Sequence, residues 1–447
     1  MRIVLTTHLF LPGHTGGTEV LSLTTAQELI RRGHDVVVCT GDPAGPAIPG
    51  EPGFDSYEHS GVRVHRYRRG SRAPEAEYND PAFGRWFRKF LKDQVPDLVH
   101  FFHLGNLSAT AIDVCRDLDV PMVMTCTDYW LICPYCQLRL PDNSQCLGPD
   151  PDHVNCLRHA VAESQPVWVR HTFQRLPRPA VAFLSGCARR DAFTHAPFAP
   201  LVKALTQRSG FLRERMEHLD RVVVPSRLMH DRLAANGVPT DKLRYQTYGI
   251  AVAPRLERVA APSDRLRIGF IGALGEHKGA HVLVRAVQSL PDSTPLEVRI
   301  YGRADFDPAY YSRLTELAGN DPRIHFCGTF PNEHIGRIFS ELDALVVPSL
   351  WYENTPLVLY SAQAAGCPVL ATNLGGLSEV IEHGVNGLLF PSGDASALAQ
   401  AIARIANDRN LLEQMRIHSR PPKSDTQYVD ELLAMYAEVL KEKGRST

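Results

Sequence analysis

Short apolar runs recur along the chain and are separated by segments with helical spacing. Residues 3–5 form the first run, a helix capped by Thr18 and ended by Gly33 follows, and a second run lies at 36–38. Runs that are apolar at every position are typical of parallel strands buried on both faces, so the pattern predicts a parallel α/β sheet in each half of the chain. The later runs lie at residues 98–99, 122–124, 222–224, 268–271, 345–347 and 369–370.

The length and charge of the chain limit the number of domains and the kinds of partner that we expect. Its 447 residues exceed the roughly 250–300 that a single core supports, so we expect two domains. A net charge of -1 gives no global field for a polyanion, which argues against nucleic acid as a partner. No apolar stretch approaches the ~20 residues that cross a bilayer. We therefore expect a cytoplasmic protein that is at most associated with the cytoplasmic face of a membrane.

Two segments of the first half have alternative interpretations. Residues 41–53 hold four glycines and four prolines, which predicts either a plain surface connection or a lid over a cleft. Residues 158–221 carry eleven Lys and Arg against five Asp and Glu, with aromatic residues between them. That segment is either a set of solvated helix faces or a surface for anionic lipid or a lipid-linked acceptor.

A glycine-rich loop follows the predicted strand at 268–271. It runs from Gly272 through Gly275 to Lys278 and Gly279, directly before a predicted helix. The exposed amides of such a helix start, together with an ammonium group, can hold a phosphate ester. The loop matches neither G-x-G-x-x-G nor the Walker pattern, which disfavours a dinucleotide-dependent oxidoreductase and an ATPase.

A second motif starts at Pro348-Ser349 and reaches Glu353, Asn354, Thr355 and Pro356. Leu357 to Ala365 then read as a helix that ends at Gly366, and Gly375-Gly376 and Glu379 lie beyond. Near the chain start, Gly16-Gly17-Thr18-Glu19 forms a comparable glycine loop.

These strings resemble glycosyltransferase family 4, whose members are retaining, nucleotide-sugar-dependent enzymes of the GT-B fold. The resemblance spans nearly the whole chain and implies two Rossmann-like domains facing a cleft, with the donor nucleotide held mainly by the C-terminal one. It implies no divalent metal for catalysis. The predicted domains are residues 1–215 on the acceptor side, with a cysteine-rich insertion near 126–159, and residues 216–425 on the nucleotide-sugar side. Residues 426–447 form a last helix that could pack back on the first domain, and the aperiodic stretch 251–263 favours a boundary near residue 250.

The resemblance also assigns roles to individual residues. Lys278 matches the family lysine that contacts the donor pyrophosphate, and Glu353 matches the first acid of the E-x7-E motif, which contacts the transferred sugar. Gly16 and Gly17 match the loop that approaches the pyrophosphate from the other domain. The segment 327–330 corresponds to the place where the base is gripped. The remaining predicted substrate-binding positions are Gly272, Asn354, Thr355, Pro356, Leu357, Val358, Cys327 and Gly328.

Three positions depart from the family pattern. Ser361 stands where the second acid holds the ribose hydroxyls, Ala273 stands where arginine is common, and Thr127 stands where histidine is common. Loss of a charge-assisted hydrogen bond, on the order of 1.5–3 kcal/mol, would weaken donor binding about 10- to 150-fold. Ser361 still offers one hydroxyl and is retained as a candidate. These departures motivate the alternative of a catalytically silent binding or partner protein in glycan assembly.

Acidic and imidazole side chains near the first-domain strands are further candidates. Asp128 is a predicted catalytic residue, and His100 and His103 could orient the sugar or the acceptor. In the front-face mechanism that the family is thought to use, the departing phosphate oxygen takes the acceptor proton, so no dedicated base is required. The sequence thus predicts transfer of a sugar from a nucleoside diphosphate to a hydroxyl of a glycan, a lipid-linked saccharide or a small molecule.

Four cysteines of the insertion have metal-ligand spacing. Cys133, Cys136, Cys146 and Cys156 follow the pattern C-x2-C-x9-C-x9-C, and His153 or His159 could replace one of them. A closed four-thiolate zinc site would be structural and would staple an irregular loop. An iron–sulfur cluster, reduced thiols or a disulfide are the other interpretations.

Overall fold

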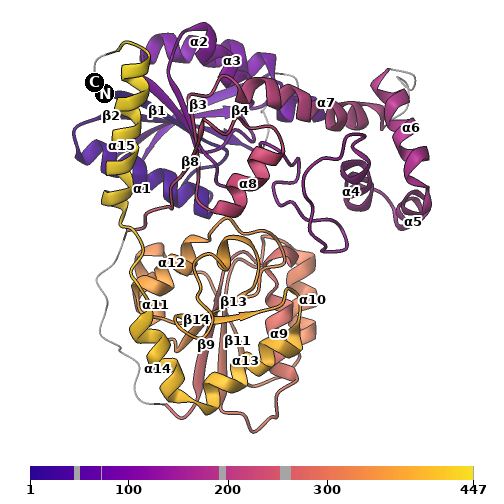
Figure 1. Ribbon diagram of the computed structural model, residues 1–447, viewed down its shortest axis with the longest axis vertical. Coiled ribbons are helices and arrows are strands. Elements are labelled where there is room, and N and C mark those ends of the chain that lie inside the picture. The colour runs from indigo at the N-terminus through magenta and orange to yellow at the C-terminus, as the bar shows by residue number, and fades with distance from the viewer. Residues whose placement is uncertain (45–50, 72, 191–197, 252–262, 446–447) are drawn as a thin grey trace. The chain divides into compact units, whose positions relative to one another are not determined.

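The computed structural model describes residues 1–44, 51–71, 73–190, 198–251 and 263–445 (Figure 1). The chain divides into two compact units. The first comprises residues 1–247 and 425–447, and the second comprises residues 248–424. Each unit is an α/β unit built on one sheet, as the apolar runs predicted.

An eight-stranded sheet of order β3-β4-β2-β1-β5-β6-β7-β8 forms the centre of the first unit. All neighbouring strands in it are parallel except the antiparallel β3–β4 pair. The strands are β1 (Arg2–Thr7), β2 (Asp35–Asp42), β3 (Gly53–His59), β4 (Val62–Arg68), β5 (Leu98–Phe101), β6 (Met122–Thr125), β7 (Arg221–Val224) and β8 (Leu243–Tyr245). The helices are α1 (Gly17–Arg31), η1 (Pro74–Glu77), α2 (Pro81–Gln94), α3 (Thr110–Asp117), α4 (Val154–Ser164), α5 (Val167–Arg175), α6 (Arg178–Arg189), α7 (Ala199–Met216), α8 (Arg227–Ala235) and α15 (Asp425–Glu442).

A six-stranded, fully parallel sheet of order β11-β10-β9-β12-β13-β14 forms the second unit. The strands are β9 (Leu266–Ile271), β10 (Leu296–Tyr301), β11 (Ile324–Gly328), β12 (Ala344–Val347), β13 (Val369–Thr372) and β14 (Gly387–Phe390). The helices are η2 (Glu276–Lys278), α9 (Ala280–Gln288), α10 (Pro308–Ala318), η3 (Asn332–His334), α11 (Ile335–Ser340), α12 (Leu357–Ala364), η4 (Gly375–Leu377), α13 (Ala395–Asn407) and α14 (Arg409–His418).

The central strands are buried on both faces, which explains their continuous apolar runs. Every residue of β5, β6, β12 and β13 is buried. In the second unit, the apolar side chains of α9 and α13 pack with those of β9, β10 and β12 in one hydrophobic cluster. Burial of this apolar surface is the main force that holds each sheet between its helices.

The structure differs from the predicted domain boundary at 215/216. Strand β7 pairs with β6, and β8 pairs with β7, so residues 216–247 extend the first sheet. The first unit therefore continues to residue 247, close to the break that the aperiodic stretch indicated. Residues 252–262 of that stretch lie outside the described residues, as do residues 45–50 of the proposed lid loop.

Helix α1 begins earlier than predicted. Gly16 rather than Thr18 is its N-cap, and no side chain caps it there. Glu19, three positions after the N-cap, accepts a hydrogen bond from the Gly16 backbone N–H. That contact is the returning half of a capping box, in which an acid satisfies the otherwise unpaired N-cap amide.

Helix α15 closes the first unit although it is the last helix of the chain. Arg32 at the end of α1 donates to Asp430 Oδ1 at 2.5 Å and to the Thr426 carbonyl at 2.9 Å. His100 on β5 lies 2.5 Å from the Tyr436 hydroxyl through Nδ1 and 2.8 Å from Thr125 Oγ1 through Nε2. His100 is thus a fully buried structural residue that ties α15 to the sheet, and this contact accounts for it without an acceptor role.

The buried histidine makes the first unit sensitive to acid. Burial lowers the pKa of His100 to about 3, against about 6.5 when the chain is unfolded. Between these values the unfolded chain binds a proton that the folded chain excludes, so stability is full above about pH 6.5 and is lost as the pH falls toward 3. We expect His100→Gln to lower the slope of unfolding free energy against pH by about 1.4 kcal/mol per pH unit between pH 6 and 4.

Urea denaturation at pH 7, 6, 5 and 4 measures this slope, with His171→Gln on the exposed face of α5 as the matched control. An unchanged slope in the His100 variant would contradict the assignment.

Within the described ranges, no helix combines the length and the apolar character needed to cross a bilayer.

Candidate functional site

The strand order of the second unit identifies where a ligand can bind. From β9 the chain proceeds outward to β10 and β11, and from β12 it proceeds to β13 and β14 on the other side. The order reverses between β9 and β12, and open parallel sheets bind ligands outside the carboxyl ends of the strands at such a point. The loop after β9 carries Lys278, and the loop after β12 carries Glu353.

Lys278 and Glu353 are in direct contact at this position. Lys278 Nζ lies 2.6 Å from Glu353 Oε1, and the same oxygen accepts from Ser349 Oγ and Trp351 Nε1, each at 2.8 Å. Lys278 Nζ also lies 5.0 Å from the centroid of the Trp351 ring. The Glu353 side chain is 3% exposed, whereas the Lys278 side chain is 23% exposed. The carboxylate is therefore held from three sides, and the ammonium group keeps N–H donors for a further anion.

Backbone contacts fix the two loops against each other. The Leu350 N–H donates to the His277 carbonyl at 2.8 Å. Gly279, the N-cap of α9, has a φ of +73°, and a Cβ there would lie 1.9 Å from the Pro348 carbonyl oxygen. Only glycine allows this left-handed conformation together with so close an approach of two backbones.

The loop after β13 supports the same site. The Gly376 N–H donates to the Glu353 carbonyl at 2.8 Å, and a Cβ on Gly376 would lie 2.0 Å from the Asn354 carbonyl oxygen. The buried Asn354 donates through Nδ2 to the Tyr248 hydroxyl at 3.0 Å and accepts from the Thr355 N–H through Oδ1 at 2.7 Å. The predicted residues 353–355 therefore form one rigid, buried turn.

Helix α12 begins at the end of this turn. Pro356 is its N-cap, and Leu357 and Val358 are its first two residues. Their amides lie in the first turn, where no carbonyl of the same helix can pair with them. Ser361 lies one turn further on, where its Oγ donates to the Leu357 carbonyl at 3.0 Å. The O–H of Ser361 is thus already donated within the helix, and its oxygen can still accept a hydrogen bond.

Glycines occupy three neighbouring strand ends beside the site. These glycines are Gly272 after β9, Gly302 after β10 and Gly328 at the end of β11. The Gly302 N–H donates to the Gly328 carbonyl at 2.8 Å, and the Gly272 N–H donates to the Tyr301 carbonyl at 3.1 Å. A Cβ on Gly302 would lie 2.3 Å from the Gly272 carbonyl oxygen. The predicted Cys327 precedes Gly328, and both are exposed, so the backbone at the end of β11 is accessible.

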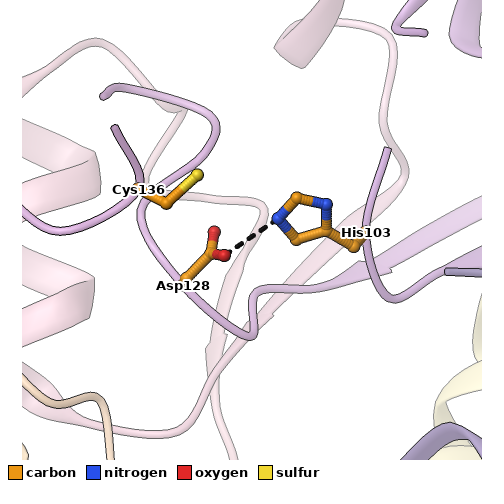
Figure 2. Close-up of side chains that lie close together, drawn as sticks. All are labelled: His103, Asp128 and Cys136. Carbon is orange, nitrogen blue, oxygen red and sulfur yellow. Dashed lines mark hydrogen bonds and ion pairs between the residues drawn. The ribbon is translucent and has the colours of Figure 1, made fainter. Parts of the chain in front are cut away.

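In the first unit, His103 and Asp128 form a hydrogen-bonded pair (Figure 2). His103 follows β5 and Asp128 follows β6, so both lie at the carboxyl ends of neighbouring strands. His103 Nδ1 accepts from the Gly105 N–H at 2.9 Å, which places the ring proton on Nε2. Nε2–H then donates to Asp128 Oδ2 at 2.9 Å, while Asp128 Oδ1 accepts from the Trp130 N–H at 2.8 Å.

The pair keeps Asp128 ionised. Burial alone would raise the pKa of Asp128, but the interaction with His103 and the Trp130 amide offsets burial, and the net shift is downward. The carboxylate is thus oriented by two donors. The Thr127 hydroxyl points elsewhere, since it donates to the Phe102 carbonyl at 3.2 Å.

Cys136 lies beside this pair, and its thiol, the imidazole and the carboxylate come within 4.8 Å of one another. Among the residues that the structure describes, these three form the only such group of potential metal ligands. A metal would need the lone pair of His103 Nε2, whereas the Gly105 N–H holds the tautomer in which Nε2 carries the proton. The arrangement therefore suits a polar cluster better than a metal centre.

Two residues of this region were given no role from the sequence. The His8 ring, after β1, lies 4.2 Å from the His103 ring, and burial lowers the pKa of His8 to about 3. Glu19 is buried, and burial raises its pKa. A Cβ on Gly16 would lie 2.5 Å from Glu19 Oε2, so the glycine admits this carboxyl to the helix start. The three-residue spacing from Gly16 to Glu19 is a capping signal that could have identified Glu19.

The predicted four-thiolate site is not assembled in the described part of the chain. Its four cysteines are free thiols and do not converge to within 4.8 Å. Cys136 instead joins His103 and Asp128. Cys133 and Cys146 are close enough to Cys156 to raise its pKa further, beyond the larger effect of burial. A structural zinc site at Cys133, Cys136, Cys146 and Cys156 stays a prediction.

One region in each of the two units matches a known protein family. Residues 15–143 match the family described as Glycosyltransferase Family 4, and residues 265–408 match the family described as Glycosyl transferases group 1. Each unit therefore contains a region that belongs to one of these two glycosyltransferase families.

Curated relatives are similar over part of the chain. The amylovoran biosynthesis glycosyltransferase AmsK of Erwinia amylovora is 32% identical over 188 residues, which are 40% of this chain and 46% of that protein. The D-inositol 3-phosphate glycosyltransferase of Nocardia farcinica is 31% identical over 196 residues, which are 42% and 43% of the two chains. The chain thus spans about half or less of the length of the curated relatives it matches.

Solved structures are similar over the whole length. The sucrose-phosphate synthase of Thermosynechococcus elongatus has a TM-score of 0.67 at 20% identity, covering 99% of both chains. Anabaena HepE in complex with UDP and glucose has a TM-score of 0.62 at 15% identity, covering 98% of this chain and 99% of that one. These likenesses confirm the predicted fold class of two Rossmann-like α/β units, as in GT-B proteins.

Proposed function

We propose that the protein is a retaining glycosyltransferase that moves a sugar from a nucleoside-diphosphate sugar to a hydroxyl of a glycan, a lipid-linked saccharide or a small molecule. The observation that carries the proposal is the contact of Lys278 with Glu353 at the switch point of the second sheet. The ligands of the structural neighbour HepE, UDP and glucose, support a uridine nucleotide as the first donor to try.

The charge distribution suits departure of a pyrophosphate. Cleavage of a glycosyl–phosphate bond leaves an oxocarbenium-like sugar and a leaving group with growing negative charge, which fixed positive potential stabilises. Lys278, held in place by Glu353, supplies an ammonium group, and the Leu357 and Val358 amides in the first turn of α12 supply further donors. In this proposal Glu353 also contacts the transferred sugar, the turn at 354–358 contacts sugar and phosphate, and Gly272 with 327–328 lies against the nucleoside.

The first unit supplies the polar groups for the acceptor side. Asp128 is ionised and held by His103 and the Trp130 amide, so it can accept a hydrogen bond from a substrate hydroxyl in one orientation. Gly16 and Gly17 are exposed at the start of α1, where the Gly17 amide can face an anion while the Gly16 amide donates to Glu19. The departing phosphate takes the proton of the attacking hydroxyl, and no catalytic metal takes part in the proposed reaction.

The stereochemical course gives the sharpest test. The purified protein is incubated with UDP-glucose and other nucleotide sugars and with saccharide acceptors, and the anomeric protons of donor and product are followed by NMR. We expect donor consumption and a product with the same anomeric configuration as the donor. A product of inverted configuration would overturn the retaining assignment.

A catalytically silent partner protein is the second candidate, and Ser361 favours it. The hydroxyl at this position donates within its own helix, and its neutral oxygen is a weaker acceptor for ribose hydroxyls than a carboxylate. Under this alternative, calorimetry detects binding of a nucleotide while the same NMR experiment shows no donor consumption with any donor. Turnover by the native protein that is lost in Glu353→Ala would exclude it.

A further inference from the structure

Helices α4, α5 and α6 form a lateral arm of the first unit (Figure 1). The arm has a small core of its own, in which apolar side chains of α4, α6 and α7 pack together. Helix α5, by contrast, has no buried residue. Because an amphipathic helix normally buries one face, α5 has more apolar surface than the arm itself covers.

The exposed apolar side chains of the chain are concentrated on this arm. Eleven large apolar residues are exposed in the described ranges, and four of them lie on α5 and α6: Val167, Trp168, Phe183 and Leu184. Trp168 is 74% exposed and Phe183 is 71% exposed. Single exposed apolar residues are normal, but a cluster of this kind marks an interaction site.

The same segment is strongly basic. Residues 165–190 contain five arginines and no aspartate or glutamate, although the whole chain has a net charge of -1. The arginines, all exposed, are Arg170, Arg175, Arg178, Arg189 and Arg190. Arg178 pairs with Asp150 at 3.1 Å, whereas no described carboxylate lies within 4 Å of Arg170 or Arg175. Helices α5 and α6 and the residue after them thus carry five exposed arginines together with the exposed Trp168 and Phe183.

We propose that α5 and α6 dock onto the surface of a bilayer that contains anionic phospholipid. Tryptophan and phenylalanine insert at the boundary between headgroups and acyl chains, and arginines around them bind the lipid phosphates. A purely electrostatic partner, such as a nucleic acid or an acidic protein, would leave Trp168 and Phe183 in water. The bilayer accounts for both the charge and the apolar surface, and this inference does not depend on the proposed sugar transfer.

Vesicle flotation with the full-length protein tests the proposal. We expect binding to vesicles of phosphatidylglycerol and phosphatidylcholine, a marked fall in binding when salt is raised, and little binding to phosphatidylcholine alone. Absence of binding to the anionic vesicles at low salt would overturn the proposal. Binding to an anionic oligonucleotide or to polyglutamate in place of vesicles would overturn it as well.

Matched variants separate the two contributions. Trp168→Asp combined with Phe183→Asp is expected to weaken vesicle binding more than tenfold, because both side chains leave the interface. The control is Phe306→Asp with Ile417→Asp, which changes residues that are 55% and 62% exposed on the second unit and should leave binding unchanged. Equal losses in the two double variants would contradict the assignment.

A second pair of changes keeps the test independent of the apolar variant. Arg170→Gln with Arg175→Gln is expected to weaken binding to anionic vesicles by about fivefold for each arginine and to reduce its salt dependence. Both residues are exposed, so the fold should be retained, which circular dichroism checks. Unchanged binding in this variant would show that α5 does not face the lipid.

Discussion

Replacing Lys278 by methionine is expected to lower the rate of sugar transfer by roughly 10²- to 10³-fold, the effect of removing one preorganised donor from a developing anion. The same change leaves the buried Glu353 carboxylate with two neutral donors, Ser349 and Trp351. Because an unpaired buried charge is costly, we also expect the free energy of unfolding to fall by about 1–3 kcal/mol, with Lys278 being partly exposed.

A double-mutant cycle separates these two effects. Glu353→Gln in the Lys278→Met background removes the unpaired charge, so part of the lost stability should return while transfer stays low. Release of nucleoside diphosphate at saturating donor measures transfer, and urea denaturation measures stability. If stability and transfer recovered together in the double variant, Lys278 would be a purely structural partner of Glu353.

Local chemistry made much of the second unit predictable from the sequence. Its strands are buried on both faces and therefore appear as apolar runs in the sequence. Its site residues lie in two short loops that carry strong sequence signals of a helix start, a glycine before one helix and a proline before the other. The direct contact of Lys278 with Glu353 was not predictable in this way, because it joins residues 75 positions apart through the pairing of β9 with β12.

The first unit was less predictable for the same reason. An apolar run such as 222–224 has the same appearance in either sheet, and only its pairing with β6 assigns it to the first. Cysteine spacing suggested one cluster, whereas the fold places Cys136 beside Asp128 of the same loop and His103 of the loop after β5. Glu19 and His8 are of interest because burial shifts their pKa values, and burial of a single side chain cannot be deduced from the pattern of residue types.

The loop after β9 and the loop after β12 approach each other closely at Gly279, next to Lys278. Disturbing this approach is expected to lower both stability and transfer rate. Gly279 and Gly393 both have a φ of +73°, so alanine is strained at either position by on the order of 1–3 kcal/mol. At Gly393 the new Cβ would meet nothing nearer than Leu350 Cδ2 at 3.8 Å, whereas at Gly279 it would lie 1.9 Å from the Pro348 carbonyl oxygen. Gly393→Ala is therefore a control for backbone strain alone.

Gly279→Ala must push the loop after β9 away from the loop after β12, which breaks the 2.8 Å bond from the Leu350 N–H to the His277 carbonyl and separates Lys278 from Glu353. A displacement of about 1 Å at a reacting centre can cost about 10²-fold in rate. We expect Gly279→Ala to lose at least ~2 kcal/mol more stability than Gly393→Ala and about 100-fold in transfer, while Gly393→Ala keeps most of its activity. Equal stability and equal transfer rates in the two variants would show that the contact between the loops does not position Lys278.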